Sequence, residues 1–300
     1  MMRIFIEASG SITSNYLIEA IKDANCEVIG SDISTFNHSK SLCNDFILMP
    51  SVEDPKLWEK TKKLLILYKI DIVIPSFDET MEVWASKIDE YKEIGIQIII
   101  SPLETIEIFQ DKWKTYNFFN QINIPTPRTS LKDEYEIIKP RQGRGGSGIF
   151  KNNYKQNISM EGMISQEKIE GTEYTVDVFF TYKGLPLYII PRKRLDIKEG
   201  KSTKGIVVRN DAINDYIIKI SENLSFLGPI NFQLFETKEK KLIFIEVNPR
   251  IAGGMALGFN ASQNWVTLII ENIIHKKEVK AKEIKYGLKM ARYYNESFFF

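Results

Sequence analysis

The amino-acid sequence predicts an α/β protein in which an N-terminal doubly wound parallel sheet is followed by a strand-rich α+β region. Over the first hundred residues, strands that are apolar throughout alternate with helices, a pattern typical of a parallel sheet covered on both faces. From about residue 135 the pattern changes to short alternating strands. The chain of 300 residues, with 43% hydrophobic and 26% charged residues, is large enough for two or three cores.

The predicted strands of the N-terminal region lie at residues 3–8, 27–31, 46–49, 70–75 and 96–101. Helical spacing of apolar residues predicts helices over residues 15–24 and 55–68, and a further helix that ends near Tyr91. In an open parallel sheet, ligands bind outside the carboxyl ends of the strands. We therefore expect the ligand edge of this region at those strand ends.

The second region begins with residues 102–121, which are mostly helical and are followed by the helix-breaking Pro125 and Pro127. Strands are predicted at residues 136–139, 149–150, 164–169, 174–181, 187–190 and 205–209. A helix over 214–224 precedes two apolar strands at 230–235 and 242–247, and a helix over 266–275 precedes an irregular tail.

Three oxygen-bearing side chains mark the last two of these strands. Glu246 and Asn248 are two residues apart, so both point to one face, and Gln233 can approach them from the neighbouring strand. Such oxygen ligands suit Mg²⁺, or Mn²⁺, held together with substrate phosphates. Arg250, one step further, is placed to contact the anion that the metal carries. The alternative for this segment is a solvated strand end that stops at Pro249.

A glycine-rich loop follows another apolar strand and has Lys139 at its start. The loop carries four glycines, Gly143, Gly145, Gly146 and Gly148, together with Ser147, and glycines let backbone N–H groups approach phosphate oxygens closely. A dinucleotide-binding motif is excluded, because the loop leads into a short strand rather than into an apolar helix. We expect a flap that joins two strands and covers a nucleotide, and a mobile surface turn is the alternative.

Several classes of function are disfavoured by composition. The net charge of +1 gives no electrostatic case for nucleic acid or an anionic membrane, and no apolar run is long enough to span a bilayer. The two cysteines and two histidines, Cys26, Cys43, His38 and His275, are unclustered, so no His/Cys metal site is expected. Without a signal-peptide pattern at the N-terminus, a cytoplasmic location with reduced thiols is the expectation.

Taken in order, these motifs resemble the ATP-grasp superfamily, most closely its carbamoyl-phosphate-synthetase-like branch in a single-copy, short form. The resemblance implies a pre-ATP-grasp domain over residues 1–104 and a two-lobed α+β ATP-grasp domain over 105–300. The small lobe would span about 112–168 and the large lobe about 169–300. Asp111-Lys112 matches the start of the family's first helix, and Gln166-Glu167-Lys168-Ile169 matches its adenine hinge.

The resemblance also implies roles for individual residues. It assigns Arg250 and Lys139 to catalysis, and Gln233, Glu246 and Asn248 to the metal. It assigns ATP to a set that combines phosphate, adenine and ribose contacts: Lys112, Lys139, Gly143, Gly145, Gly146, Ser147, Gly148, Glu167, Lys168, Ile169 and Glu173. Arg192 and Arg194 lie where relatives meet the acceptor and could hold a carboxylate or phosphate bidentately; an exposed basic turn is the alternative.

The activity implied is the ATP-dependent joining of a small-molecule carboxylate to an amine through an acyl phosphate, with ATP and Mg²⁺ as cofactors and a homodimer as the assembly. Carbamoyl phosphate synthetases use a histidine in the substrate half, but neither His38 nor His275 falls there, so bicarbonate is disfavoured. Two alternatives stay open: a nucleotide-binding or regulatory protein without turnover, and a subunit of a larger ligase assembly.

Overall fold

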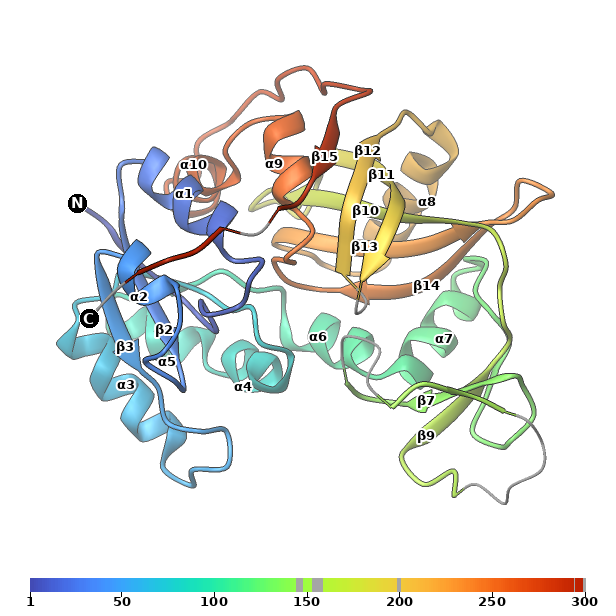
Figure 1. The fold of residues 1–300 in the computed structure, drawn as a ribbon, viewed down its shortest axis with the longest axis horizontal. Coiled ribbons are helices and arrows are strands. Elements are labelled where there is room, and N and C mark those ends of the chain that lie inside the picture. The colour runs from blue at the N-terminus through green and yellow to red at the C-terminus, as the bar shows by residue number, and fades with distance from the viewer. Residues whose placement is uncertain (144–147, 153–158, 199–200, 294, 299–300) are drawn as a thin grey trace.

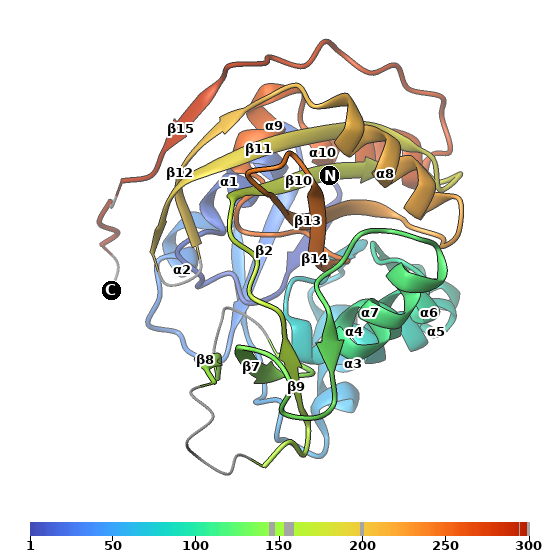
Figure 2. The ribbon, with the colours of Figure 1, turned by 90° about the vertical axis from the view of Figure 1, so that its right-hand side faces the viewer.

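Among the described residues, three sheets organise the fold, with five, four and six strands; Figure 1 shows their arrangement. The computed structural model describes residues 1–143, 148–152, 159–198, 201–293 and 295–298. The predicted Gly145, Gly146 and Ser147 lie outside these described residues. Figure 2 shows the small sheet, with β7 and β9, set apart from the large sheet of β10 to β14.

The N-terminal sheet is parallel throughout, in the order β3-β2-β1-β4-β5, as predicted. Alternate residues of β1 enter different cores: Ile4 and Ile6 pack on one face of the sheet and Phe5 on the other, which explains the continuous apolar strand. The strands are β1 (Arg3–Ile6), β2 (Glu27–Asp32), β3 (Asp45–Leu48), β4 (Ile72–Ile74) and β5 (Gln97–Ile98). The helices are α1 (Asn15–Asp23), α2 (Ser39–Leu42), α3 (Leu57–Leu67), the 3₁₀ helix η1 (Asp78–Thr80), α4 (Met81–Ser86) and α5 (Ile88–Glu93).

Two helices lead into the small antiparallel sheet, whose order is β6-β9-β7-β8. The helices are α6 (Leu103–Gln110) and α7 (Lys112–Gln121), and the strands are β6 (Thr129–Ser130), β7 (Ile137–Pro140), β8 (Phe150–Lys151) and β9 (Met163–Gln166). Because β7 and β8 are antiparallel neighbours, the glycine-rich loop joins two strands, as predicted.

The large sheet is antiparallel, in the order β14-β13-β10-β11-β12-β15. Its strands are β10 (Thr172–Phe180), β11 (Pro186–Lys198), β12 (Lys201–Val207), β13 (Gly228–Glu236), β14 (Leu242–Asn248) and β15 (Lys289–Ala291). Helices α8 (Asp211–Ser221), α9 (Ala256–Ala261) and α10 (Trp265–Leu268) and the π-helical turn η2 (Ile269–Ile274) complete this part.

Three predictions for this region were wrong in detail. Strand β11 runs eight residues beyond the predicted end at 190, because it pairs with β10 on one side and β12 on the other. The tail expected to be irregular contributes β15, which pairs with β12. The helix expected over 266–275 is a short α10 that continues as η2.

The N-terminal sheet and the large sheet share one hydrophobic core. It contains Leu17 and Ile18 of α1 together with Trp265 and Val266 of α10, and the side chain of Asn264 donates to the backbone oxygen of Ala20 at 2.7 Å. Because this interface is buried and apolar, loops of the N-terminal region are held in fixed positions beside the large sheet.

Candidate active site

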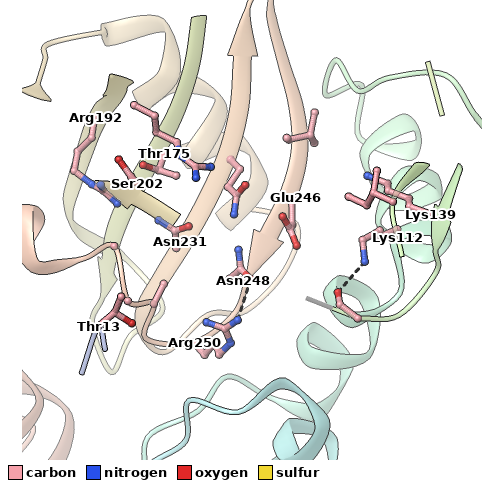
Figure 3. A pocket seen from close by; sticks show the side chains of 18 of the residues that line it. Thr13, Lys112, Lys139, Thr175, Arg192, Ser202, Asn231, Glu246, Asn248 and Arg250 are labelled. Carbon is pink, nitrogen blue, oxygen red and sulfur yellow. Dashed lines mark hydrogen bonds between the residues drawn. The ribbon is translucent and has the colours of Figure 1, made fainter. Parts of the chain in front are cut away.

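One cavity of about 350 Å³ brings together residues from the N-terminal region, the small sheet and the large sheet (Figure 3). Many residues predicted from the sequence line it: Lys112, Lys139, Gly143, Arg192, Arg194, Gln233, Glu246, Asn248 and Arg250. In Figure 3, Lys112 and Lys139 lie on one side, Arg192 and Thr13 on the other, and Glu246 and Asn248 between them.

The oxygen-bearing side chains meet through the pairing of β13 with β14. Gln233 is the register partner of Glu246, so the predicted approach from a neighbouring strand is confirmed. A bulge next to this pair brings both Ile245 and Glu246 to the cavity. The side chains of Glu246 and Gln233 have no hydrogen-bond partner among the described residues, whereas Asn248 Oδ1 accepts from Arg250 Nη2 at 3.3 Å. A carboxylate and an amide that face a cavity without protein partners fit a Mg²⁺ ion.

Asn231 belongs to the same cavity and was missed in the sequence. It is the register partner of Asn248 and is 3% exposed, and its side-chain amide donates to Asp177 Oδ1 at 2.8 Å. Asn231 and Gln233 are two residues apart on β13, so the alternation that relates Glu246 to Asn248 also predicts this position.

Lys139 lies on β7, opposite the oxygen cluster formed by the side chains of Gln233, Glu246 and Asn248, and is 9% exposed. Burial lowers the pKa of its ammonium group to about 8, although the negative charge of Glu246 opposes this shift. Lys112 adds to the lowering through like-charge repulsion. The positive charges of Lys112 and Lys139 therefore repel each other in the cavity. A bound polyanion would reduce this repulsion and would offset the cost of removing the Lys139 ammonium group from water.

Lys112 is fixed by the start of α7. The carboxylate of Asp111 caps the helix by accepting from the backbone N–H of Trp113 at 2.8 Å, and it also pairs with Arg141 at 2.5 Å. The ammonium group of Lys112 then donates to the backbone oxygen of Gly143 at 3.0 Å, an interaction drawn in Figure 3. The helix start and the glycine-rich loop are thus held together at one side of the cavity.

Two glycines of the loop that the structure describes have backbone conformations that suit glycine. Gly143 has φ +123° and lines the cavity, and Gly148 has φ +70°. A Cβ at Gly148 would also lie 3.0 Å from the Pro140 ring. Larger residues would strain the loop at both positions.

The predicted adenine-hinge residues lie on the connection between β9 and β10 and are not among the described residues that line the cavity. The Arg128 guanidinium pairs with the Glu167 carboxylate at 3.1 Å and lowers its pKa. The side chain of Lys168 pairs with Glu170. Ile169 follows Lys168 in the chain. The assignment of Glu167, Lys168 and Ile169 to adenine stays a prediction.

Arg192 and Arg194 lie on strand β11, so the alternative of an exposed basic turn is wrong. Arg192 is 1% exposed and its guanidinium Nε lies 2.6 Å from Asp177 Oδ2, with Nη2 donating to Oδ1 at 2.8 Å. Arg194 pairs with Glu173, whose pKa is raised by burial even though Arg194 favours its charged form. Glu173 is thus connected to the cavity lining by its ion pair with Arg194.

Arg250 is held by an acid that sequence reasoning did not identify. Asp78, in η1 after β4, accepts from Arg250 Nε at 2.8 Å and from Nη2 at 2.5 Å. The side chains are 13% and 20% exposed, so the pair is largely removed from water. The N-terminal region therefore contributes directly to the site, through a contact between residues 172 positions apart.

A buried carboxylate positions the segment that carries Asp78. Glu7, at the end of β1, accepts from the backbone N–H groups of Ser76 and Phe77, each at 3.2 Å, and from the side chains of Thr80 and Trp84, each at 2.9 Å. Burial raises its pKa, and the four donors oppose that shift. The strand end and η1 are thereby tied together.

Within the part of the chain that the structure describes, no three or more His, Cys, Asp or Glu side chains form a metal-binding group. The cluster at β13 and β14 contains one carboxylate and two amides, which suits a metal that is held mainly by phosphates. None of the described helices has the length and apolar character needed to cross a membrane.

Two family models match the chain. Residues 159–295 match the model described as "ATP-grasp in the biosynthetic pathway with Ter operon". Residues 4–99 match the model described as "PylC-like, N-terminal domain". The first covers the large sheet and the oxygen cluster, and the second covers the parallel sheet.

Among curated proteins, the carbamoyl-phosphate synthase of Methanobrevibacter smithii is 26% identical over 230 residues. The match covers 66% of this chain and 62% of that protein, so the chain spans less than two thirds of this relative.

Solved structures share the fold at lower identity. The N5-carboxyaminoimidazole synthetase from Staphylococcus aureus, complexed with ADP, has a TM-score of 0.74 and 15% identity, over 95% of this chain and 80% of that chain. The biotin carboxylase domain dimer of the 2-oxoglutarate carboxylase from Hydrogenobacter thermophilus has a TM-score of 0.73 and 15% identity, over 96% of this chain and 73% of that chain.

Proposed function

We propose that this chain is an ATP- and Mg²⁺-dependent carboxylate–amine ligase, because residues 159–295 match an ATP-grasp model and residues 4–99 match a PylC-like N-terminal model. The terminal phosphoryl group of ATP passes to a carboxylate oxygen, and ADP leaves. The amine nitrogen then forms a bond with the activated carbonyl carbon, the bond from that carbon to the phosphate oxygen breaks, and the amine loses a proton. The products are an amide, ADP and phosphate.

The observation that carries this proposal is the placement of Lys139 opposite Glu246, one on each side of the cavity. Phosphoryl transfer depends mainly on positioning and on neutralising charge, so it requires cations and a metal-binding carboxylate facing the same phosphates. Lys139 is buried with a lowered pKa, and Glu246 lacks a partner among the described residues. Both features suit a cavity made for a metal-bound polyphosphate.

In this proposal the phosphates of ATP lie between the small sheet and the large sheet. Lys112, Lys139 and Gly143 bind them, and Gln233, Glu246 and Asn248 would hold Mg²⁺, which would supply positive charge to the transferred group. Arg250 stabilises the charge that develops on that phosphoryl group. From the resemblance, the adenosine part is assigned to Glu167, Lys168, Ile169 and Glu173.

Arg192 and Arg194 are proposed to face the acceptor. Asp177 holds Nε and Nη2 of the Arg192 guanidinium, and the Gly254 backbone also lies close to it, since a Cβ there would be 3.2 Å from Nη2. Arg192 therefore has a fixed orientation, and its remaining N–H groups are available to an acceptor oxygen.

The reaction can be tested before the natural amine is known, because hydroxylamine traps an acyl phosphate as a hydroxamate. The wild-type protein would be incubated with Mg²⁺, ATP and a panel of carboxylic acids, and hydroxamate and ADP would be measured. We expect at least one acid to yield both in equal amounts, and Glu246→Gln to slow the formation of both on the order of 10²–10³-fold. Nucleotide binding without carboxylate-dependent ADP release over the panel would favour the binding-protein alternative.

We propose a homodimer as the assembly, on the basis that the similar Hydrogenobacter thermophilus domain is described as a dimer. Light scattering at several protein concentrations tests this. A mass of 34.7 kDa at every concentration, the mass of one chain, would contradict it.

A further inference from the structure

The arginines that line the cavity differ in how their charge is balanced. Among the described residues they are Arg192, Arg194, Arg250 and Arg292. The first three each pair with a carboxylate, from Asp177, Glu173 and Asp78 respectively. Arg292 has no carboxylate partner in the part of the chain that the structure describes. A positive charge without a counter-ion at a cavity wall attracts an anion from outside.

Arg292 is held in place although it follows the last strand. Its backbone N–H donates to Thr203 O at 2.8 Å, which continues the pairing of β15 with β12. Its guanidinium Nε donates to Ser202 O at 3.1 Å and its Nη2 to Gly253 O at 2.5 Å. No described residue accepts from Nη1, so this end of the fork is left for a ligand.

The segment opposite Arg292 provides further donors. Gly253 and Gly254 line the cavity, and their backbone N–H groups donate to no group among the described residues. Thr13 approaches so closely that a Cβ at Gly253 would lie 2.1 Å from its hydroxyl oxygen. The Tyr16 hydroxyl fixes the segment by donating to Ala252 O at 2.7 Å.

The described residues of the cavity wall at this end include no acid that could repel an anion. Glu246 is the one acidic residue among the described residues of the lining, and it faces Lys139 on the other side. Asp177 lies close by, but it is 0% exposed and its charge is matched by Arg192. The local balance is therefore positive.

We infer that Arg292, the Thr13 hydroxyl and the amides of Gly253 and Gly254 form an anion subsite that receives a carboxylate or phosphate group carried by the acceptor substrate. That the occupant is a substrate rests on the proposed ligase function. ATP is assigned to the side of Lys112 and Lys139, and in Figure 3 Thr13 and Ser202 lie on the opposite side of Glu246 and Asn248. The acceptor thus carries an anionic group in addition to the group that reacts.

Calorimetry tests this inference without knowledge of the natural substrate. Inorganic phosphate, succinate and the monoanion succinamate would be titrated into protein saturated with Mg²⁺ and a non-hydrolysable ATP analogue, which keeps the probes out of the triphosphate site. We expect phosphate or succinate to bind, and succinamate to bind more weakly than succinate. Phosphate binding without succinate binding identifies a phosphorylated acceptor, and the reverse identifies a dicarboxylate.

The decisive variant is Arg292→Ala, which should weaken binding of the preferred anion at least about tenfold, because charge-assisted hydrogen bonds are lost. Its affinity for the ATP analogue should be unchanged. Arg209→Ala is the matched control, since Arg209 is 71% exposed and pairs with Asp211 away from the cavity lining. If Arg292→Ala does not fold, Arg292→Lys decides, and it should bind the anion several-fold more weakly with an unchanged melting temperature.

Two outcomes overturn the inference: wild-type protein that binds neither anion, and Arg292 variants that bind them as wild type does. A failure of the proposed function is seen separately, as wild-type protein that does not bind the Mg²⁺-bound ATP analogue. In that case, phosphate titrated alone into wild-type protein and Arg292→Ala still measures the subsite.

Discussion

Asp78 clamps Arg250 with both carboxylate oxygens, at 2.8 Å to Nε and 2.5 Å to Nη2. The arginine follows strand β14, and the aspartate follows strand β4 of the N-terminal sheet. A group proposed to stabilise the transferred phosphate is therefore oriented by a residue of the N-terminal region. Arg250 Nη1 also donates to Ile251 O at 3.2 Å. Few N–H groups of the Arg250 guanidinium are therefore left without an acceptor.

Asp78→Asn should weaken this clamp while keeping the size of the side chain. Because Arg250 would lose its charged partner in a poorly hydrated place, we expect the free energy of unfolding to fall by about 1–3 kcal/mol. The rate of phosphoryl transfer should fall more than the affinity for ATP, because orientation matters most in the transition state. Denaturant titration and steady-state kinetics measure the two effects.

The surface pair of Glu59 with Lys63 provides the control, with side chains 59% and 72% exposed. Glu59→Gln should leave both stability and kinetics as in the wild type, because exposed ion pairs are screened by water. If Asp78→Asn behaves in the same way, the clamp has no energetic importance.

Mg²⁺-bound ATP should raise the melting temperature, because a ligand that binds only the folded state stabilises it by mass action. At a concentration about 100-fold above Kd the gain in unfolding free energy should be roughly 2.7 kcal/mol. Differential scanning calorimetry with ATP plus EDTA isolates the contribution of the metal. A melting curve that responds to NAD but not to Mg²⁺-bound ATP would contradict the assignment of the cavity.

A comparison of Glu246→Gln with Glu167→Ala distinguishes residues that act in phosphoryl transfer from residues that recognise adenine. The first removes the single charge of the oxygen cluster, so kcat should fall on the order of 10²–10³-fold. The second removes contacts made equally before and during the reaction, so it should mainly raise the KM for ATP. Kinetics with any carboxylate found by hydroxamate trapping measures both, and equal, small losses would leave the strand end without a metal role.

Lys139 should make stability depend on pH in the alkaline range. The pKa of this lysine is about 8 in the folded protein, against an ordinary value of 10.5. Below pH 8 both states carry the proton, so the cost of burying the charge is fully present. Between pH 8 and 10.5 the unfolded state binds more protons, so the free energy of unfolding should rise with pH, by up to about 3 kcal/mol.

Denaturant titrations of wild type and Lys139→Met at several pH values test this. The variant should be the more stable protein near pH 7, and its advantage should disappear toward pH 10.5. Parallel curves over that range would show that the lysine is better hydrated than its burial indicates.

Local chain pattern was sufficient to predict part of the site. Glu246 and Asn248 share a face because strand residues alternate, and the pairing with Gln233 follows once the two strands are neighbours. The parallel sheet was equally accessible, since strands buried on both faces are apolar throughout. In each case the information lies within a few consecutive residues.

The remaining features depend on contacts between distant segments. Asp78 and Arg250 are 172 residues apart, and no local pattern indicates that they meet. Charged residues follow Arg192, so the sequence pattern did not indicate how far β11 extends. The charge of Arg192 is matched by Asp177 on the neighbouring strand β10, which the pattern of β11 alone does not reveal. Strand β15, with only three residues, gains its order from β12 and not from its own sequence.

The cavity has walls from nearly opposite ends of the sequence, since Thr13 and Arg292 both line it. During synthesis the parallel sheet and most of the large sheet can form before residue 292 exists, because domains fold in order from the N-terminus. Strand β15 follows the other strands of the large sheet in the chain and pairs with the edge of β12. A chain synthesised only as far as residue 291 would therefore lack Arg292 in the cavity lining, and with it the guanidinium that we propose receives an anion.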